Sequence, residues 1–157
     1  MISTARPRLE LDVATSMLLT PYAEACVSLE EGGIPIGAAL FDRDGVFYGA
    51  GHNRRVQDGD PSLHAETDAF RSAGRRRDYP DLVMATTLSP CWYCAGLIRQ
   101  FNIGTLVVGD DINFQGAHQW LADLGVEVHV INMEECVEQM ATFIEARPDL
   151  WHEDIGL

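Results

Sequence analysis

The chain has 157 residues, of which 46% are apolar and 22% charged, as in ordinary globular proteins, and this composition excludes a disordered chain. No stretch approaches the roughly 20 apolar residues of a membrane span, and residues 1–12 lack the apolar core of a signal peptide, so we expect a cytoplasmic protein without a membrane partner. The net charge of −13 repels a phosphate backbone, so we expect no nucleic-acid partner.

The chain shows no internal repeat, linker or low-complexity tract, which predicts a single domain over residues 1–157. Apolar periodicity and turn residues predict its elements. In chain order these are a helix over 11–31 with a break or a restart capped by Thr20 at Pro21, strands over 36–41 and 46–48, a polar loop over 51–61, a helix over 62–73, a strand over 82–88, a helix over 91–101, a strand over 105–109, a helix over 118–124, a strand over 126–131 and a helix over 133–146. A hairpin followed by alternating helices and strands predicts an α/β protein, a three-layer α/β/α sandwich with a mixed five-stranded sheet.

Two short motifs stand where predicted helices begin, the place where ligands bind in such sheets. One is His64-Ala65-Glu66, and the other is Cys91-Trp92-Tyr93-Cys94 after Pro90. One imidazole and two thiolates suit a tetrahedral zinc ion, and an open fourth position would hold water, as in catalytic sites. Helix N-termini also favour the thiolate form of cysteine. The spacing therefore predicts Zn²⁺ held by His64, Cys91 and Cys94.

Glu66 follows the histidine by two residues, so its carboxylate can reach the zinc site without being a ligand. There it can carry a proton from the attacking water to a ring nitrogen, and later to the leaving ammonia. The combination of HxE with PCxxC is typical of zinc-dependent nucleobase deaminases. Either motif alone would be weak evidence, because a lone CxxC also fits a redox site.

The competing interpretation is a purely structural zinc site, completed by His52 or His118 as a fourth ligand. It would leave Glu66 without a role. The remaining cysteines, Cys26 and Cys136, sit singly in predicted helices, and we expect both to be small buried apolar residues.

From about Gly32 to Gly156 the chain resembles the small fungal-type cytosine deaminases, within the cytidine-deaminase-like superfamily. The resemblance rests on residues 32–37 (GGIPIG), 51–53 (GHN), 63–66 (LHAE), 86–91 (TTLSPC), 107–109 (VVG), 113–114 (NF) and the tail segments 147–148 (RP) through Trp151 and 153–156 (EDIG). The tail match is the most specific, because the broader superfamily does not share it.

This resemblance implies a zinc-dependent enzyme of pyrimidine salvage that hydrolyses cytosine to uracil and ammonia, with Glu66 as its proton shuttle. It implies that Asn53 and Asp154 bond the pyrimidine edge, and that backbone groups at Ala65, Ser89 and Cys91 contact the substrate. It also implies that the tail forms a lid over the site and that three side chains pack on the substrate ring. The ring-packing residues are Ile36, Phe114 and Trp151. Because the family is homodimeric, we expect a homodimer.

Four of the substrate residues have a plainer alternative. Asp154 could be a solvated tail residue, although a carboxylate there would accept the N1–H of free cytosine and reject cytidine, whose N1 carries ribose. Trp151 could simply anchor the tail in the core, and Phe114 could be a loop residue tucked into it. Asn53 could merely shape the turn after Gly51.

Two departures from the family pattern leave open which base is the substrate. Trp92 and Tyr93 replace a pair that is typically one small or acidic residue and a methionine, and His152 stands where an aromatic residue is expected. Large aromatics in this turn could reshape the pocket wall or the dimer contact. The alternatives are therefore a deaminase of another amino heterocycle (guanine, a triazine or a pterin-like ring) and a non-catalytic zinc-stabilised interaction domain. The net charge of −13 disfavours a tRNA adenosine deaminase.

Overall fold

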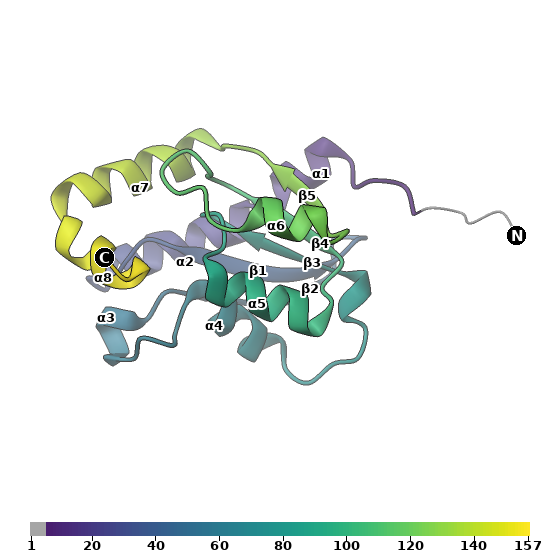
Figure 1. Ribbon diagram of the computed structural model, residues 1–157, viewed down its shortest axis with the longest axis horizontal. Coiled ribbons are helices and arrows are strands. Elements are labelled where there is room, and N and C mark those ends of the chain that lie inside the picture. Colours follow the sequence, from purple (N-terminus) through teal and green to yellow (C-terminus); the bar gives the residue numbers. More distant parts are fainter. Residues whose placement is uncertain (1–5) are drawn as a thin grey trace, which may run out of the picture.

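The computed structural model describes residues 6–157, so the first five residues of the domain expected over 1–157 lie outside the described part. A mixed five-stranded sheet in the order β2-β1-β3-β4-β5 forms its centre (Figure 1). β1 pairs antiparallel with both β2 and β3, whereas β3, β4 and β5 are parallel, which confirms the predicted sheet. The strands are β1 (Gly37–Asp42), β2 (Phe47–His52), β3 (Leu82–Thr86), β4 (Thr105–Val108) and β5 (Glu127–Val130).

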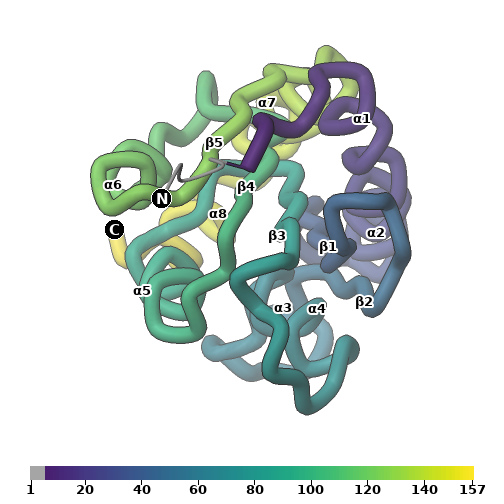
Figure 2. Tube along the Cα trace, turned by 90° about the vertical axis from the view of Figure 1, so that its right-hand side faces the viewer, coloured from purple at the N-terminus to yellow at the C-terminus, as the bar shows by residue number. Residues whose placement is uncertain are grey.

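Helices cover both faces of the sheet, as the view along it shows (Figure 2). Successive strand residues point to opposite faces, so Leu40 and Met84 belong to one buried cluster, while Ala39 and Val83 belong to the other. The first cluster includes residues of α4, α5 and α6, and the second includes residues of α1. The helices are α1 (Leu11–Ser16), α2 (Leu19–Glu30), α3 (Arg55–Asp58), α4 (Ala65–Ala73), α5 (Trp92–Phe101), α6 (His118–Asp123), α7 (Glu134–Ala146) and α8 (Pro148–Ile155), with a short 3₁₀ turn over Tyr79–Asp81.

The predicted first helix divides into α1 and α2, but Pro21 neither breaks nor begins a helix. It is the third residue of α2, in a turn whose backbone N–H groups have no intrahelical acceptor, so a proline costs little there. The residue that caps α2 is Leu18 rather than Thr20. The predicted cap was therefore wrong.

The second strand of the hairpin is longer than predicted, since β2 runs through Gly49 and Gly51 to His52. These glycines indicated a loop, but they serve a close approach of α4. A Cβ atom on Gly49 would lie 2.5 Å from the backbone nitrogen of Ala73, and one on Gly51 would lie 2.5 Å from the Asp68 carboxylate. The predicted polar loop also contains α3.

The tail forms α8, which begins with Pro148, a residue suited to the first helical position. Figure 1 places α8 (yellow) beside α3 at one end of the molecule. This brings the last residues of the chain next to the end of β2, where Asn53 lies. Within the described residues, no helix has the length and apolar character needed to cross a bilayer.

Candidate active site

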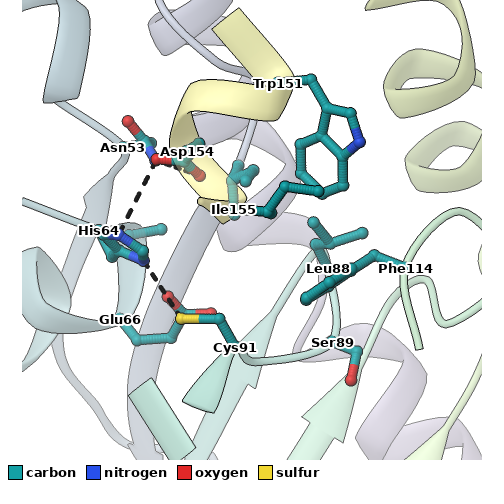
Figure 3. Close-up of a pocket in the computed structure, with 12 residues that line it drawn as sticks. Asn53, His64, Glu66, Leu88, Ser89, Cys91, Phe114, Trp151, Asp154 and Ile155 are labelled. Carbon is teal, nitrogen blue, oxygen red and sulfur yellow. Dashed lines mark hydrogen bonds and ion pairs between the residues drawn. The ribbon is translucent and has the colours of Figure 1, made fainter. Parts of the chain in front are cut away.

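All the residues predicted to bind metal and substrate except Cys94 line a small cavity next to the starts of α4 and α5 (Figure 3). Polar groups from Asn53, His64, Glu66 and Asp154 lie on one side of this view, and apolar side chains lie on the other. Sequence reasoning did not single out two of the lining residues, Leu88 and Ile155, although both lie in motif segments. The lining residues are Ile36, Asn53, His64, Ala65, Glu66, Leu88, Ser89, Cys91, Phe114, Trp151, Asp154 and Ile155.

The side chains predicted to bind metal lie at the beginnings of two helices. His64 and Cys91 are the N-cap residues of α4 and α5, with extended backbones, and Cys94 lies fully buried in the first turn of α5. Both helices therefore direct their N-terminal ends toward the same point, where the partial positive charge of each helix favours thiolates.

The donor atoms fit a zinc ion. One ligand atom each from His64, Cys91 and Cys94 lies within 4.8 Å of the others, and His64 Nδ1 is 3.5 Å from Cys91 Sγ. Tetrahedral zinc with ordinary bond lengths would set such donors roughly 3.6–3.8 Å apart. Among residues 6–157, these three form the group able to hold a metal ion.

Both alternative fourth ligands are engaged elsewhere. His52 Nδ1 lies 2.6 Å from a carboxylate oxygen of Glu24, and His52 Nε2 lies 2.6 Å from one of Glu31. His118 Nδ1 lies 3.0 Å from the Ser89 hydroxyl and 2.8 Å from a backbone carbonyl. These contacts count against a structural zinc site completed by either histidine.

The buried acids around this point favour a divalent cation. The pKa of the Cys91 thiol is lowered to about 4, because the Cys94 thiol donates a hydrogen bond to it and His64 adds a second, despite burial. Burial raises the pKa of the Glu66 carboxyl, and the neighbouring Cys91 raises it further. Glu66 Oε1 lies 2.9 Å from the Thr86 hydroxyl, a contact that sequence reasoning missed. A zinc ion bound here would favour the ionised forms of these acidic groups.

Asp154 is buried, so it is not a solvated tail residue. Its carboxylate accepts hydrogen bonds from Asn53 Nδ2 at 3.2 and 3.3 Å and from Arg55 Nε at 3.1 Å, and its Oδ1 lies 3.9 Å from His64 Nε2. Asn53 Oδ1 accepts the backbone N–H of Arg55 at 3.0 Å, so Asn53 also shapes the turn. No local pattern marked Arg55, whose role follows only from the position of α8.

The apolar side chains that line the cavity also pack against the hydrophobic core. Phe114 and Trp151 pack edge to face, with ring centroids 5.5 Å apart and planes at 86°. Trp151 is 6% exposed and belongs to the main buried cluster, so it anchors the tail and lines the cavity at once. The Ser89 hydroxyl turns away from the cavity to donate to the Gln115 carbonyl, which leaves the backbone of Ser89 on the cavity side (Figure 3).

Trp92 and Tyr93 stand outside this cavity, so they do not shape its wall. They are 70% and 51% exposed and line an adjoining open groove. The groove shares five lining residues with the cavity: His64, Cys91, Phe114, Asp154 and Ile155. His152 is also exposed.

Comparison with known proteins agrees with the site. Residues 14–110 match the model of the cytidine and deoxycytidylate deaminase zinc-binding region. The chain is 42% identical over 135 residues to the cytosine deaminase of Candida albicans, covering 85% of this chain and 90% of that protein. It is 30% identical over 159 residues to the tRNA-specific adenosine deaminase of Haemophilus influenzae, covering 93% and 90%.

Solved structures show the same fold. A tRNA:A34 deaminase superposes with a TM-score of 0.67 at 26% identity, covering 80% of this chain and 99% of that one. The protein NE0047, solved in complex with 2,6-diaminopurine, gives a TM-score of 0.71 at 22% identity, covering 88% and 84%. The family match, the relatives and the histidine–cysteine group lead to one conclusion: this chain belongs to the cytidine and deoxycytidylate deaminase family and is a zinc-dependent hydrolytic deaminase.

Proposed function

We propose that the protein is a cytosine deaminase, a single domain that converts free cytosine to uracil and ammonia in cytoplasmic pyrimidine salvage. The observation that carries the proposal is the hydrogen-bonded pair of Asn53 and Asp154, which lines the cavity beside the metal-binding group. The 42% identity to the Candida albicans cytosine deaminase supports it.

His64, Cys91 and Cys94 would hold the zinc ion, which when bound supplies the Lewis acidity that makes water a nucleophile near neutral pH. Glu66 is the proton carrier. It takes a proton from the water that attacks C4 of cytosine and delivers it to N3, and then it moves the proton of the new C4 hydroxyl group to the amino nitrogen. The bond from C4 to the amino nitrogen then breaks and ammonia leaves. The Thr86 hydroxyl, 2.9 Å from Glu66 Oε1, holds the carboxyl group in place.

The pyrimidine edge would meet Asn53 and Asp154. One Asn53 amide hydrogen is used by Asp154, and the second is free to bond the O2 carbonyl of the base. Asp154 Oδ2 has lone-pair capacity beyond its bond from Asn53, so it can accept the N1–H of a free base. The carboxylate thus positions Asn53 and also contacts the substrate. Ribose on N1 would remove this hydrogen and collide with α8.

The remaining predicted contacts complete the pocket. Backbone groups of Ala65, Ser89 and Cys91 would bond the amide and amino groups of the base, since all three line the cavity. The side chains that would pack on the ring are those of Ile36, Phe114 and Trp151.

We also propose that the protein is a homodimer. Large apolar side chains are exposed on α5 and α6, where Trp92 packs edge to face on Trp120 with ring centroids 5.8 Å apart. Phe101 and Leu124 are exposed on the same two helices or directly after them. A second copy would cover this surface. Light scattering after gel filtration should give the mass of two chains, and a monomeric mass would contradict the proposal.

The decisive experiment is an ammonia-release assay of the zinc-loaded protein with cytosine, cytidine, guanine, a triazine and an adenosine-containing tRNA loop. We expect turnover of cytosine and none of cytidine. A preference for guanine or a triazine would show that the substrate is another amino heterocycle. Absence of turnover with every substrate, with zinc bound, would favour an interaction domain.

A further inference from the structure

We propose that Tyr93 is a positioning residue of the metal site, whose ring braces the imidazole of His64 and slows the release of zinc. The proposal rests on the zinc site described above. It concerns a side chain that the CxxC pattern leaves unspecified, because only Cys91 and Cys94 are fixed by that pattern.

The rings of Tyr93 and His64 are in direct contact. The centroids of Tyr93 and His64 are 5.2 Å apart, and their planes meet at 87°, an edge-to-face arrangement that is attractive between aromatic rings. The Tyr93 hydroxyl donates to the backbone carbonyl of Ser62 at 3.3 Å, two residues before His64. Tyr93 therefore contacts both the metal ligand and the segment that leads to it.

Tyr93 complements the other two contacts of the imidazole. His64 Nδ1 faces Cys91 Sγ at 3.5 Å, and His64 Nε2 faces Asp154 Oδ1 at 3.9 Å. These contacts act at the ring nitrogens, whereas Tyr93 packs on the ring itself. A histidine leaves its metal by rotating about its side-chain bonds, and groups that hold the ring orientation retain the metal. The side chain of His64 is only 12% exposed, and both it and Tyr93 line the outer groove.

The neighbouring tryptophan provides an internal control. Trp92 occupies the same turn of α5 and is more exposed than Tyr93, at 70% against 51%, but it packs on Trp120 rather than on His64. Because Tyr93 is itself half exposed, its truncation leaves no cavity in the core, and the fold should survive it. An effect on zinc can therefore be separated from an effect on folding.

The test compares zinc-loaded wild type with Tyr93→Ala, Tyr93→Phe and Trp92→Ala. Each protein is mixed with an excess of a chromogenic zinc chelator, and the rate of zinc transfer is followed by absorbance. Outer groups that hold a ligand are typically worth about 10–100-fold in metal affinity, so we expect Tyr93→Ala to release zinc at least about 10-fold faster. Tyr93→Phe keeps the ring and should stay within about 3-fold of wild type, as should Trp92→Ala.

The melting temperatures of metal-free wild type, Tyr93→Ala and Tyr93→Phe complete the experiment, and they should agree. Trp92→Ala is left out of this comparison because Trp92 lies in the surface proposed to form the dimer. Zinc release from Tyr93→Ala at the wild-type rate would overturn the proposal. An equal acceleration in Trp92→Ala would also overturn it, because the effect would belong to the helix turn rather than to the ring contact. A lower melting temperature confined to metal-free Tyr93→Ala would assign Tyr93 to folding instead. A wild-type protein that binds no zinc would overturn the proposed function as well, which distinguishes the two failures.

Discussion

Asn53 and Asp154, 101 residues apart in the chain, are joined side chain to side chain, with Asn53 Nδ2 at 3.2 and 3.3 Å from the two carboxylate oxygens. The bond ties the residue after β2 to the C-terminal helix α8. The tail is therefore a wall of the cavity, and the geometry of Asn53 depends on it. Changes in α8 should consequently alter substrate selection as well as stability.

Asp154→Ala tests this dependence. The change removes the acceptor of an amide hydrogen of buried Asn53, at a cost of roughly 1–3 kcal/mol, and leaves Glu153, 3.9 Å away, as the remaining carboxylate beside Arg55. We expect kcat/KM for cytosine to fall by about 5- to 150-fold with zinc content unchanged. Asp149→Ala, at an exposed position in the first turn of the same helix, is the control.

A double-mutant cycle with Asn53→Ala separates the two roles of Asp154. If Asp154 acts partly through Asn53, the combined loss is smaller than the sum of the single losses. If Asp154→Ala lowers the stability while the ratio of cytosine to cytidine turnover stays the same, α8 stabilises the fold but does not select the substrate.

Glu66→Gln should retain zinc and the fold while turnover nearly disappears. A general acid–base group contributes about 10²–10⁴-fold, and the proposed mechanism assigns Glu66 more than one proton transfer. Steady-state kinetics together with metal analysis check this. Glu30→Gln, on the exposed surface of α2, should behave as wild type. More than about a tenth of the wild-type activity in Glu66→Gln would contradict the shuttle role.

The Asp68 carboxylate should make the free energy of unfolding depend on pH. Burial alone would raise the pKa of its carboxyl, but hydrogen bonds from Arg71, Arg54 and the His52 backbone outweigh burial and lower that pKa. A carboxyl whose folded pKa is lowered stabilises the fold above its unfolded pKa of about 3.9, and this stabilisation is lost as the pH falls through the folded value.

Asp68→Asn should therefore reduce the free energy of unfolding at pH 7 by roughly 1–3 kcal/mol. The gap to wild type should stay constant down to about pH 5 and close below about pH 4, as measured by urea unfolding. Asp44→Asn, in the exposed hairpin turn, is the matched control. A gap that persists unchanged into strong acid would show that the Asp68 charge is not its source.

Two glycines should respond to alanine in opposite directions. Gly49→Ala would place a Cβ 2.5 Å from the Ala73 nitrogen and 2.8 Å from its Cα, so overpacking should destabilise the protein by about 1–3 kcal/mol. Gly96 lies inside α5 with open space around its Cβ position, so Gly96→Ala should stabilise the protein by about 0.5–1 kcal/mol. Thermal unfolding of both variants checks the pair, and equal shifts would contradict the close packing of α4 on β2.

The chemistry of the metal site was readable from the sequence because it is local. His64 and Glu66 lie two residues apart at the start of α4, and Cys91 and Cys94 lie within one helical turn at the start of α5. The spacing within each pair is therefore enough to place its two members close together. The sheet followed from the same kind of information, since buried strands such as β3 are continuous apolar runs. The length of β2 was not predictable locally, because its glycines are typical of a loop. Their reason is the close packing of α4 against the strand.

Only the tertiary structure decided the contacts of Arg55 with Asp154 and of Tyr93 with His64. These pairs are joined across 99 and 29 residues by the docking of α8 on α3 and of α5 on the start of α4. Periodicity reports which side of an element faces the core, but the partner that it meets there depends on how separate elements pack. The sequence alone therefore predicted the histidine–cysteine group and the deaminase chemistry, whereas packing decided which side chains surround that group and close the cavity.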